Sequence, residues 1–216
     1  MKKWFIIEGN IGSGKTTLIN KLKNNSNFEV FEEPVEVWRN IKGSNEQNLL
    51  GLFYEDPIRY SYLFQTIVFK TRLQSLDIIQ QKNIRFSERS IWSDKYVFGK
   101  SCIENNKMNE LEKNCYYQWF DWLEEKFNPI ASGIIYVKTS PELCLERIQQ
   151  RARGEENTIP LSYLKELDDR HNLWLENWTS TPVLIIDNNN ENNIDINIDN
   201  INHWNNILDQ INNFIL

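Results

Sequence analysis

A glycine-rich segment near the N-terminus has the residue types and spacing of a phosphate-binding loop. Gly9 and Gly14 have four residues between them, Lys15 and Thr16 follow directly, and the apolar run Trp4–Ile7 precedes the segment. Apolar residues at helical spacing predict a helix beginning near Lys15, whose N-terminus would add partial positive charge for phosphate. Lys15 would reach the β- and γ-phosphates, and the Thr16 hydroxyl is a natural Mg²⁺ ligand. The pattern predicts an ATP-like ligand with Mg²⁺, held by Gly9, Asn10, Ile11, Gly12, Ser13, Gly14, Lys15, Thr16 and Thr17.

Charged residues follow two further β-like runs. Glu33 comes after Phe28–Phe31, and Glu88 and Arg89 come after Asn83–Ser87. Side chains at the carboxyl ends of parallel strands face the crevice where such sheets bind ligands. Taken alone, Glu33 would be a solvated charge and Glu88–Arg89 a local ion pair. Beside a phosphate loop, they are candidates for binding the acceptor of a phosphoryl group.

An arginine cluster forms the third candidate group. Arg147, Arg151 and Arg153 lie in one short segment, and Arg147 and Arg151 are one helical turn apart on the same face. Arginines that converge from one mobile segment can neutralise a phosphoryl group during transfer. A solvated helix face is the alternative for such a cluster alone, and the phosphate loop favours the catalytic interpretation.

The elements that position these residues indicate an α/β fold in one domain, residues 1–216. Long helix-patterned stretches separate most of the β-like runs, which suits a parallel sheet covered on both faces. Asp56-Pro57 and Ser140-Pro141 each place a capping residue before a helix-starting proline. An Asn-rich loop is expected over residues 187–200, followed by a helix that packs back on the domain. The expected strands are Trp4–Ile7, Phe28–Phe31, Asn83–Ser87, Gly133–Lys138 and Val183–Ile186.

Composition excludes several classes of protein. The chain of 216 residues has 24 basic and 30 acidic side chains, a net charge of −6, which argues against a binder of duplex DNA or anionic membranes. No apolar run approaches the roughly 18 residues of a membrane span. Its three cysteines match neither a disulfide framework nor a zinc site, which favours a reducing compartment. Because the first apolar run begins at Trp4, no leader is expected, and the predicted location is cytoplasmic.

Three motifs in this order carry a resemblance to a known family. They are Glu33-Pro34-Val35-Glu36-Val37-Trp38, Glu88-Arg89-Ser90 and the lid segment Arg151 to Glu156. From residue 4 to about residue 186 the chain resembles the deoxyribonucleoside kinases, which include deoxycytidine, deoxyguanosine and insect multisubstrate kinases. The resemblance implies a five-stranded parallel sheet, an arginine-rich lid at about residues 147–160, and usually a homodimer.

The resemblance also implies roles for matching residues. Glu33 would be the general base on the nucleoside 5′-hydroxyl, Arg89 would hold that carboxylate and the nascent phosphate, and Glu88 would serve the Mg²⁺ shell. Core packing is the alternative for the aromatic residues. The remaining assignments are Tyr54 and Glu156 for the sugar 3′-hydroxyl, Gln65 for the base edge, and Trp38, Phe64 and Phe98 for the walls around the base.

Two further residues bear on which nucleoside is accepted. Arg72 lies seven residues after Gln65, so the two share a helix face, and Asp94 lies six residues after Glu88. In the family, Arg and Asp at these positions accompany deoxycytidine and purine deoxynucleoside kinases. A buried Arg–Asp pair suits an amino-bearing base and occupies the space that a thymine methyl group needs. Deoxyguanosine is favoured, while deoxycytidine and deoxyadenosine stay open.

Two other functions compete with this interpretation. A nucleoside-monophosphate kinase, such as a thymidylate kinase, shares the loop, sheet and lid, but it needs an arginine anchor for the acceptor's own phosphate. A non-catalytic nucleotide-binding protein is expected to have lost Lys15, Glu33, Arg89 or a lid arginine, and all are present.

Overall fold

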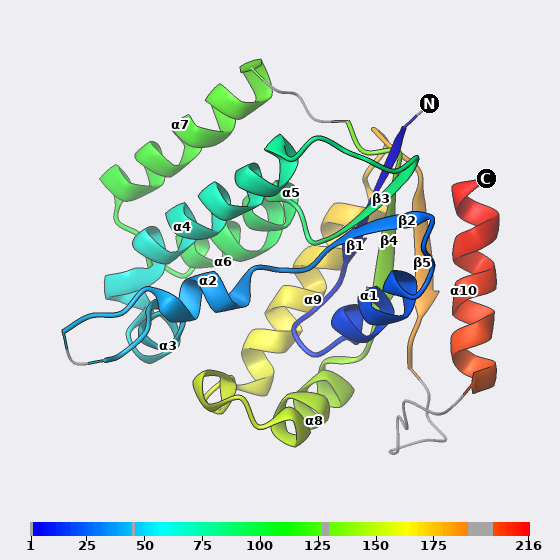
Figure 1. Cartoon of the computed structure of the whole chain (residues 1–216). Coiled ribbons are helices and arrows are strands. Elements are labelled where there is room, and N and C mark those ends of the chain that lie inside the picture. The colour runs from blue at the N-terminus through cyan, green and yellow to red at the C-terminus, as the bar shows by residue number, and fades with distance from the viewer. Residues whose placement is uncertain (1, 45, 127–129, 190–200) are drawn as a thin grey trace.

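A parallel sheet forms the centre of the molecule. The computed structural model describes residues 2–44, 46–126, 130–189 and 201–216. Within these ranges five strands pair in the order β2-β3-β1-β4-β5 (Figure 1). Every strand is parallel to its neighbours, so the predicted α/β class is confirmed. The strands are β1 Lys3–Glu8, β2 Phe28–Phe31, β3 Ile84–Glu88, β4 Gly133–Lys138 and β5 Val183–Asp187, whose ends differ from the prediction by one residue at most.

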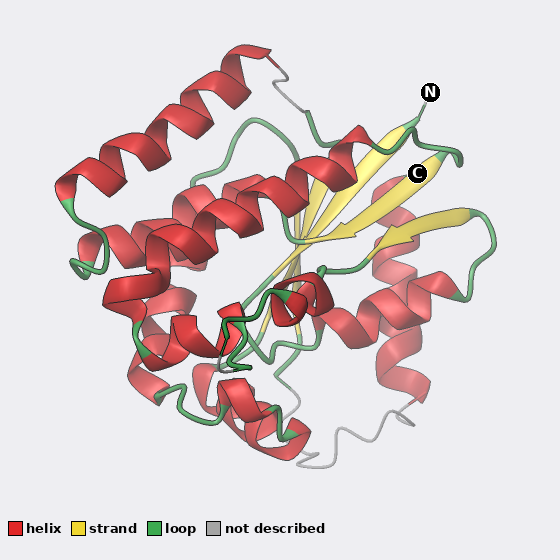
Figure 2. Ribbon diagram, turned by 60° about the vertical axis from the view of Figure 1, so that its left-hand side comes forward, coloured by secondary structure: helices red, strands yellow, loops and turns green. Residues whose placement is uncertain are grey.

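Helices cover both faces of the sheet, as its buried apolar strands require (Figure 2). One face packs on α1 (Lys15–Lys23) and α10 (Ile201–Ile215), and the other on α8 (Pro141–Arg151) and α9 (Leu161–Glu176). A separate apolar cluster joins the helices that follow β2 and β3. Those helices are α2 Val35–Asn40, α3 Leu49–Glu55, α4 Pro57–Asp77, α5 Ile91–Ser93, α6 Gly99–Glu104 and α7 Glu110–Lys126.

The predicted helix starts are confirmed by their caps. The Asp56 side chain accepts a hydrogen bond from the backbone N–H of Arg59 at the start of α4. The Ser140 side chain accepts one from Leu143 at the start of α8. Each cap satisfies a backbone donor that the first helical turn leaves without a partner.

The C-terminal part differs slightly from the prediction. Asp187 belongs to β5, so it is strand and not loop, and residues 190–200 of the expected Asn-rich loop lie outside the described residues. Asn188 is buried. The predicted packing of α10 against the domain is confirmed, because Trp204, Ile207 and Ile211 lie in the apolar core beside the sheet (Figure 1).

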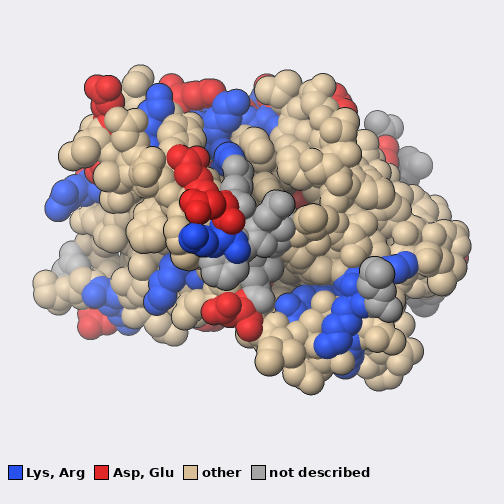
Figure 3. Space-filling view, turned by 90° about the horizontal axis from the view of Figure 1, so that it is seen from above, with Lys and Arg blue, Asp and Glu red and all other residues tan. Residues whose placement is uncertain are grey.

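One face of the molecule presents charges of both signs. On the face seen in Figure 3, acidic side chains lie near the middle and a group of basic side chains lies at the lower right. In the described ranges, no helix has the length and apolar character needed to cross a membrane.

Candidate active site

The glycine-rich loop joins the end of β1 to α1 and takes a backbone path that needs glycine. Gly12 has φ of 78° and Gly14 has φ of 94°, in the left-handed region that side chains disfavour. A Cβ atom on Gly12 would lie 2.5 Å from the carbonyl oxygen of Cys144. Glycine at these positions therefore lets the loop pack tightly on α8 while α1 begins at Lys15.

Side chains from distant elements hold the loop in place. The Asn10 amide donates to the carbonyl oxygen of Leu164 at 2.8 Å. The carbonyl oxygen of Ser13 accepts hydrogen bonds from Thr139 at 3.1 Å and from Asn188 at 2.9 Å. The loop backbone is thus fixed before any phosphate binds, which lowers the cost of ordering it.

A cavity of about 590 Å³ extends from this loop towards α3 and α4. Of the predicted phosphate-loop residues, Ile11 to Thr17 line it, whereas Gly9 and Asn10 do not. The structure brings all the other predicted site residues to the same cavity. They are Glu33, Trp38, Tyr54, Phe64, Gln65, Arg72, Glu88, Arg89, Asp94, Phe98, Arg147, Arg151, Arg153 and Glu156.

Lys15 and Thr16 face the cavity beside Glu88. The Lys15 ammonium donates to the carbonyl oxygen of Asn10 at 2.6 Å. Burial, followed by the positive charge of Arg89, lowers the pKa of Lys15 to about 8. The Thr16 hydroxyl donates to a Glu88 carboxylate oxygen at 2.9 Å.

A hydroxyl beside a carboxylate is an oxygen donor set that suits Mg²⁺. In the part of the chain that the structure describes, no cluster of three His, Cys, Asp or Glu side chains could hold a metal alone. Thr16 and Glu88 therefore fit a Mg²⁺ ion that takes its remaining ligands from phosphate oxygens and water.

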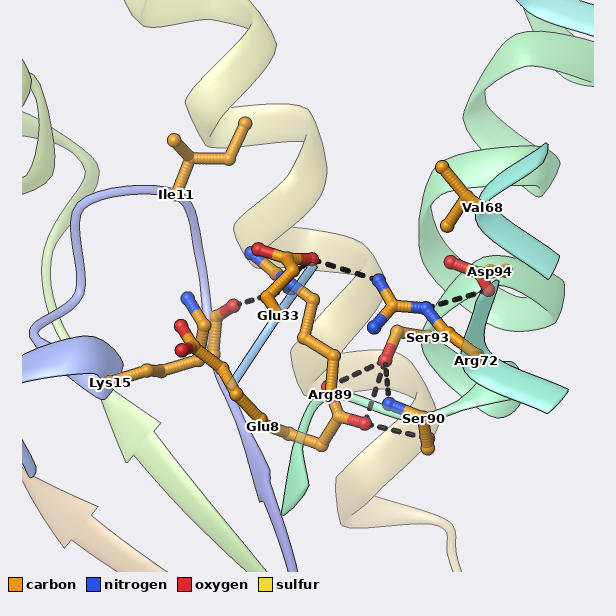
Figure 4. A network of polar contacts seen from close by, with 12 residues as sticks. Glu8, Ile11, Lys15, Glu33, Val68, Arg72, Arg89, Ser90, Ser93 and Asp94 are labelled. Atoms are coloured by element: carbon orange, nitrogen blue, oxygen red, sulfur yellow. Dashed lines mark hydrogen bonds and ion pairs between the residues drawn. The ribbon is translucent and has the colours of Figure 1, made fainter. Parts of the chain in front are cut away.

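Glu33 is the centre of an ion-pair network, drawn in Figure 4. Its Oε1 atom lies 2.9 Å from Nη2 of Arg72 and 3.2 Å from Nε of Arg89. Burial alone would raise the pKa of Glu33, but Arg89, Arg72 and Lys15 together hold it below its usual value. The carboxylate is therefore ionised at neutral pH.

Arg72 links Glu33 to the predicted base end of the cavity. Its Nε donates to Oδ2 of Asp94 at 2.8 Å, so the expected Arg72–Asp94 contact is present, with only 1% of the Asp94 side chain exposed. Burial raises the pKa of Asp94 to about 7, although Arg72 acts in the opposite direction. The bond from Arg72 to Glu33 was not predicted from the sequence.

Three buried polar atoms remain at this end of the cavity. No hydrogen-bond partner is found within the described residues for Oε1 of Gln65, Nη1 of Arg72 or Oδ1 of Asp94. Buried polar groups without partners are costly. Since all three residues line the cavity, their arrangement suits a ligand that supplies both donors and acceptors.

The predicted aromatic walls belong to the cavity and to the core together. Trp38 and Phe64 pack edge to face, with ring centroids 5.4 Å apart, inside the helical apolar cluster. The Arg89 guanidinium lies 4.5 Å from the ring centroid of Phe98. Ordinary packing and a cavity-lining position are therefore compatible for these residues.

The lid segment folds over the cavity. Its short 3₁₀ turn, η2 (Gly154–Glu156), brings Glu156 into contact with Arg151 and, at 3.4 Å, with Arg153. Burial and then the charge of Glu156 raise the pKa of Tyr54, which indicates that the two predicted sugar-binding residues are close. Arg147 also lines the cavity, and its Nε and Nη1 atoms have no partner among the described residues.

Several residues of the site were missed by the sequence analysis. Glu155, next to Glu156, turns away from the cavity and pairs with Arg39 at 2.8 Å and with Asn48 at 3.0 Å, which ties the lid to α2 and α3. Tyr163 also lines the cavity. Glu8 is buried and lies near Arg89. It ends β1, so the argument that places Glu33 at the ligand-binding edge of the sheet could have identified Glu8 as well.

These contacts define an α/β nucleotide-binding protein equipped to transfer a phosphoryl group. The family model described as deoxynucleoside kinase matches residues 5–216. The chain is 38% identical over 209 residues to a mitochondrial deoxyguanosine kinase of Xenopus laevis, covering 83% of this chain and 79% of that protein. It therefore belongs to the deoxynucleoside kinase family and is an ATP-dependent phosphotransferase.

Other relatives act, by their names, on different nucleosides. A probable deoxycytidine kinase of Fowlpox virus is 39% identical over 215 residues, covering 97% of this chain and 86% of that protein. A mitochondrial thymidine kinase 2 of Macaca fascicularis is 37% identical over 190 residues, covering 86% of this chain and 71% of that protein. Similarity of this kind establishes the family and leaves the nucleoside open.

Proposed function

We propose that this enzyme transfers the γ-phosphoryl group of ATP to the 5′-hydroxyl of a deoxyribonucleoside. Deoxyguanosine is the favoured acceptor, with deoxycytidine and deoxyadenosine as further candidates. The observation that carries the proposal is the ionised Glu33 carboxylate, which shares a cavity with the phosphate loop and lies between Arg72 and Arg89.

Glu33 would orient the 5′-hydroxyl and accept its proton as the new O–P bond forms. Phosphoryl transfer passes through a loose transition state in which the attacking hydroxyl keeps its proton until late. A carboxylate with a lowered pKa suits that timing, because it stays ionised and positions the hydroxyl by hydrogen bonding. Arg89, 3.2 Å from Glu33, would stabilise both the carboxylate and the transferring group.

The donor side would be supported by Lys15 and the lid arginines. Four cationic side chains of the phosphate loop and the lid line the cavity: Lys15, Arg147, Arg151 and Arg153. Their positive charge would stabilise the phosphates. We place Mg²⁺ at Thr16 and Glu88, where it would neutralise charge on the phosphates when bound.

The base preference rests on the unpartnered atoms near Gln65. Arg72 offers a donor and Asp94 an acceptor, while the Gln65 amide can present either group. An amino-bearing base supplies a donor for Asp94 and an acceptor for Arg72, whereas thymine has a carbonyl oxygen in place of the amino group of cytosine and carries a methyl group on the neighbouring carbon. This chemistry fits guanine, cytosine or adenine, and the choice of deoxyguanosine among them rests on the family resemblance.

The cavity favours a neutral hydroxyl acceptor over a nucleoside monophosphate. Arg72 is engaged by Asp94 and Glu33, and Arg89 is engaged by Glu33. A second anion on the acceptor, if bound by Arg72 or Arg89, would lie next to the Glu33 carboxylate, which would repel it. The thymidylate-kinase alternative is disfavoured for that reason.

We also propose a homodimer, which the family resemblance implies. Exposed apolar side chains on α4 and α7 support it: Leu63 is 50% exposed, Trp119 43% and Trp122 41%. Light scattering of the purified chain should give twice the monomer mass. The cytoplasmic location stays a prediction, supported by the free thiols among the described residues, although two of the relatives above are mitochondrial by name.

A coupled assay with ATP, Mg²⁺ and each of the four deoxynucleosides tests the function, with thymidylate as a fifth acceptor. We expect turnover with the amino-bearing nucleosides and none with thymidylate. Glu33→Gln should lower kcat by about 10²- to 10⁴-fold, with a smaller loss of nucleoside affinity by calorimetry. Glu55→Gln, an exposed glutamate outside the cavity, is the matched control. Phosphorylation of thymidylate alone, or an unchanged kcat in Glu33→Gln, would refute the proposal.

A further inference from the structure

A second buried carboxylate, Glu8, lies next to the acceptor site and has no part in the transfer chemistry. It is the last residue of β1 and comes directly before Gly9 of the phosphate loop. Its side chain is fully buried. A buried carboxylate is retained only where specific partners compensate for its desolvation.

The partners of Glu8 are two serines from the segment after β3 (Figure 4). The Ser90 hydroxyl donates to Oε1 of Glu8 at 2.7 Å, and the Ser93 hydroxyl lies 2.7 Å from both carboxylate oxygens. The Ser93 hydroxyl in turn accepts from the backbone N–H of Ser90 at 3.0 Å. Glu8 is thus the common acceptor for the turn that contains both serines.

That turn carries residues of the acceptor site on either side. Arg89, directly before Ser90, has φ of 62°, a left-handed conformation that costs a non-glycine residue free energy and persists only when its surroundings fix it. Directly after Ser93 comes the π-helical turn η1 (Asp94–Phe98), which begins with Asp94. Arg89 contacts Glu33, and Asp94 contacts Arg72.

We propose that Glu8 is a positioning residue of the acceptor site, which fixes Arg89 and Asp94 through Ser90 and Ser93. This inference rests on the proposed function, because it assigns Arg89 and Asp94 to the acceptor. Burial raises the pKa of the Glu8 carboxyl, and the positive charge of Arg89 acts in the opposite direction. The hydrogen bonds of Glu8 to the two serines therefore hold the backbone between Arg89 and Asp94.

Kinetics of Glu8→Gln, with Ser93→Ala as a milder variant, test the proposal. The amide keeps the size of the carboxylate, but it has no charge and puts an NH₂ donor in place of one of the two carboxylate oxygens that contact the Ser93 hydroxyl. We expect kcat/KM for the preferred nucleoside to fall at least about tenfold, while KM for ATP stays within about twofold of wild type. The preference among the four nucleosides should narrow because Asp94 is no longer fixed. Ser93→Ala should show a smaller loss, and the double variant no more than the loss of Glu8→Gln.

Tyr136→Phe is the matched control, because it removes a buried hydroxyl that contacts Asn172 at 3.0 Å and does not line the cavity. It should lower stability and leave the kinetics unchanged. A folded Glu8→Gln variant with wild-type kcat/KM and nucleoside preference would overturn the proposal. So would an equal loss towards ATP, which would place the effect in the phosphate loop. If Glu8→Gln does not fold, Ser93→Ala decides by the same criteria.

The same measurements separate this inference from the proposed function. Wild-type enzyme that neither binds nor phosphorylates any deoxynucleoside refutes the function, and the positioning role with it. An active wild type with an unaffected Glu8→Gln variant refutes only the positioning role.

Discussion

The contact between Arg72 and Asp94 offers the most direct test of how this site selects a base. Both side chains are buried, with 5% of Arg72 and 1% of Asp94 exposed, and Nε and Oδ2 are 2.8 Å apart. Removing one partner of a buried pair costs about 3–5 kcal/mol, because the other charge stays buried. Removing both partners avoids that cost.

The two single variants should differ, because Arg72 has two carboxylate partners and Asp94 has one guanidinium partner. Asp94→Ala leaves Arg72 paired with Glu33. Arg72→Met leaves Asp94 alone and also removes the 2.9 Å bond to Glu33, a loss of about 1.5–3 kcal/mol for a bond to a charged group. Arg72→Met should therefore be the less stable and the slower of the two.

The double variant Arg72→Met with Asp94→Ala should recover stability and accept thymidine better. It removes both charges and opens space for the thymine methyl group, while Glu33 keeps Arg89 as a partner. One such contact changes discrimination by about 10- to 200-fold. Gln65 can remain, since its amide can rotate to match either base edge.

The assay compares kcat/KM for the four deoxynucleosides in wild type, both single variants and the double variant, with urea unfolding of each. Kinetics at saturating nucleoside separate the effect on Glu33 from the effect on binding. Wild-type enzyme that already prefers thymidine would contradict the assignment of the pair. An unchanged order of kcat/KM values among the nucleosides in the double variant would contradict it as well. If Asp94→Ala were less stable than Arg72→Met, the argument from two carboxylate partners of Arg72 would be wrong.

Other parts of the site give further tests. Lys15→Ala should abolish turnover in a folded protein by removing several kcal/mol of transition-state stabilisation, and a soluble variant with near-wild-type turnover would exclude the phosphate-loop role. Thr16→Val should raise the Mg²⁺ concentration needed for half-maximal activity, and Glu88→Gln should do the same; an unchanged Mg²⁺ titration in both would move the ion elsewhere. His171 is fully buried with Nδ1 2.7 Å from the Leu167 carbonyl oxygen, and burial lowers its pKa to about 3. The unfolded chain then binds one more proton below about pH 6.5, so the free energy of unfolding should fall by about 2 kcal/mol from pH 6.5 to pH 5. His171→Phe should flatten this part of the pH profile, and an equally steep profile in the variant would assign the acid sensitivity to other groups.

The strands and the phosphate loop could be predicted because local sequence dictates them. The apolar run Gly133–Val137 is buried along its whole length, as expected for a strand of a sheet that is covered on both faces. The glycines of the loop adopt a left-handed backbone conformation that side chains disfavour. The caps Asp56 and Ser140 act on neighbouring N–H groups, so the sequence contains both partners.

The distribution of contacts within the site depends on tertiary structure and could not be predicted in full. Spacing places Arg72 on the same helix face as Gln65, but the distance to Glu33 depends on how α4 meets the end of β2. Glu155 and Glu156 are identical residue types in sequence, and only the 3₁₀ turn sends one to Arg39 and the other into the cavity. The π-helical turn that begins at Asp94 likewise follows a turn held by a distant carboxylate.

Under the proposed function, base recognition and chemistry would share one guanidinium. Arg72 contacts Asp94 through Nε and Glu33 through Nη2, so a change in how a base engages Asp94 would alter the charge environment of the carboxylate proposed to serve the 5′-hydroxyl. A weaker hold of Arg72 on Glu33 would raise the pKa of Glu33, because burial then acts against one cation fewer. A base that displaces Arg72 should therefore lower kcat as well as affinity. Discrimination among nucleosides by this site is accordingly expected in the transition state, where a correctly seated base leaves the ion pair between Arg72 and Glu33 intact.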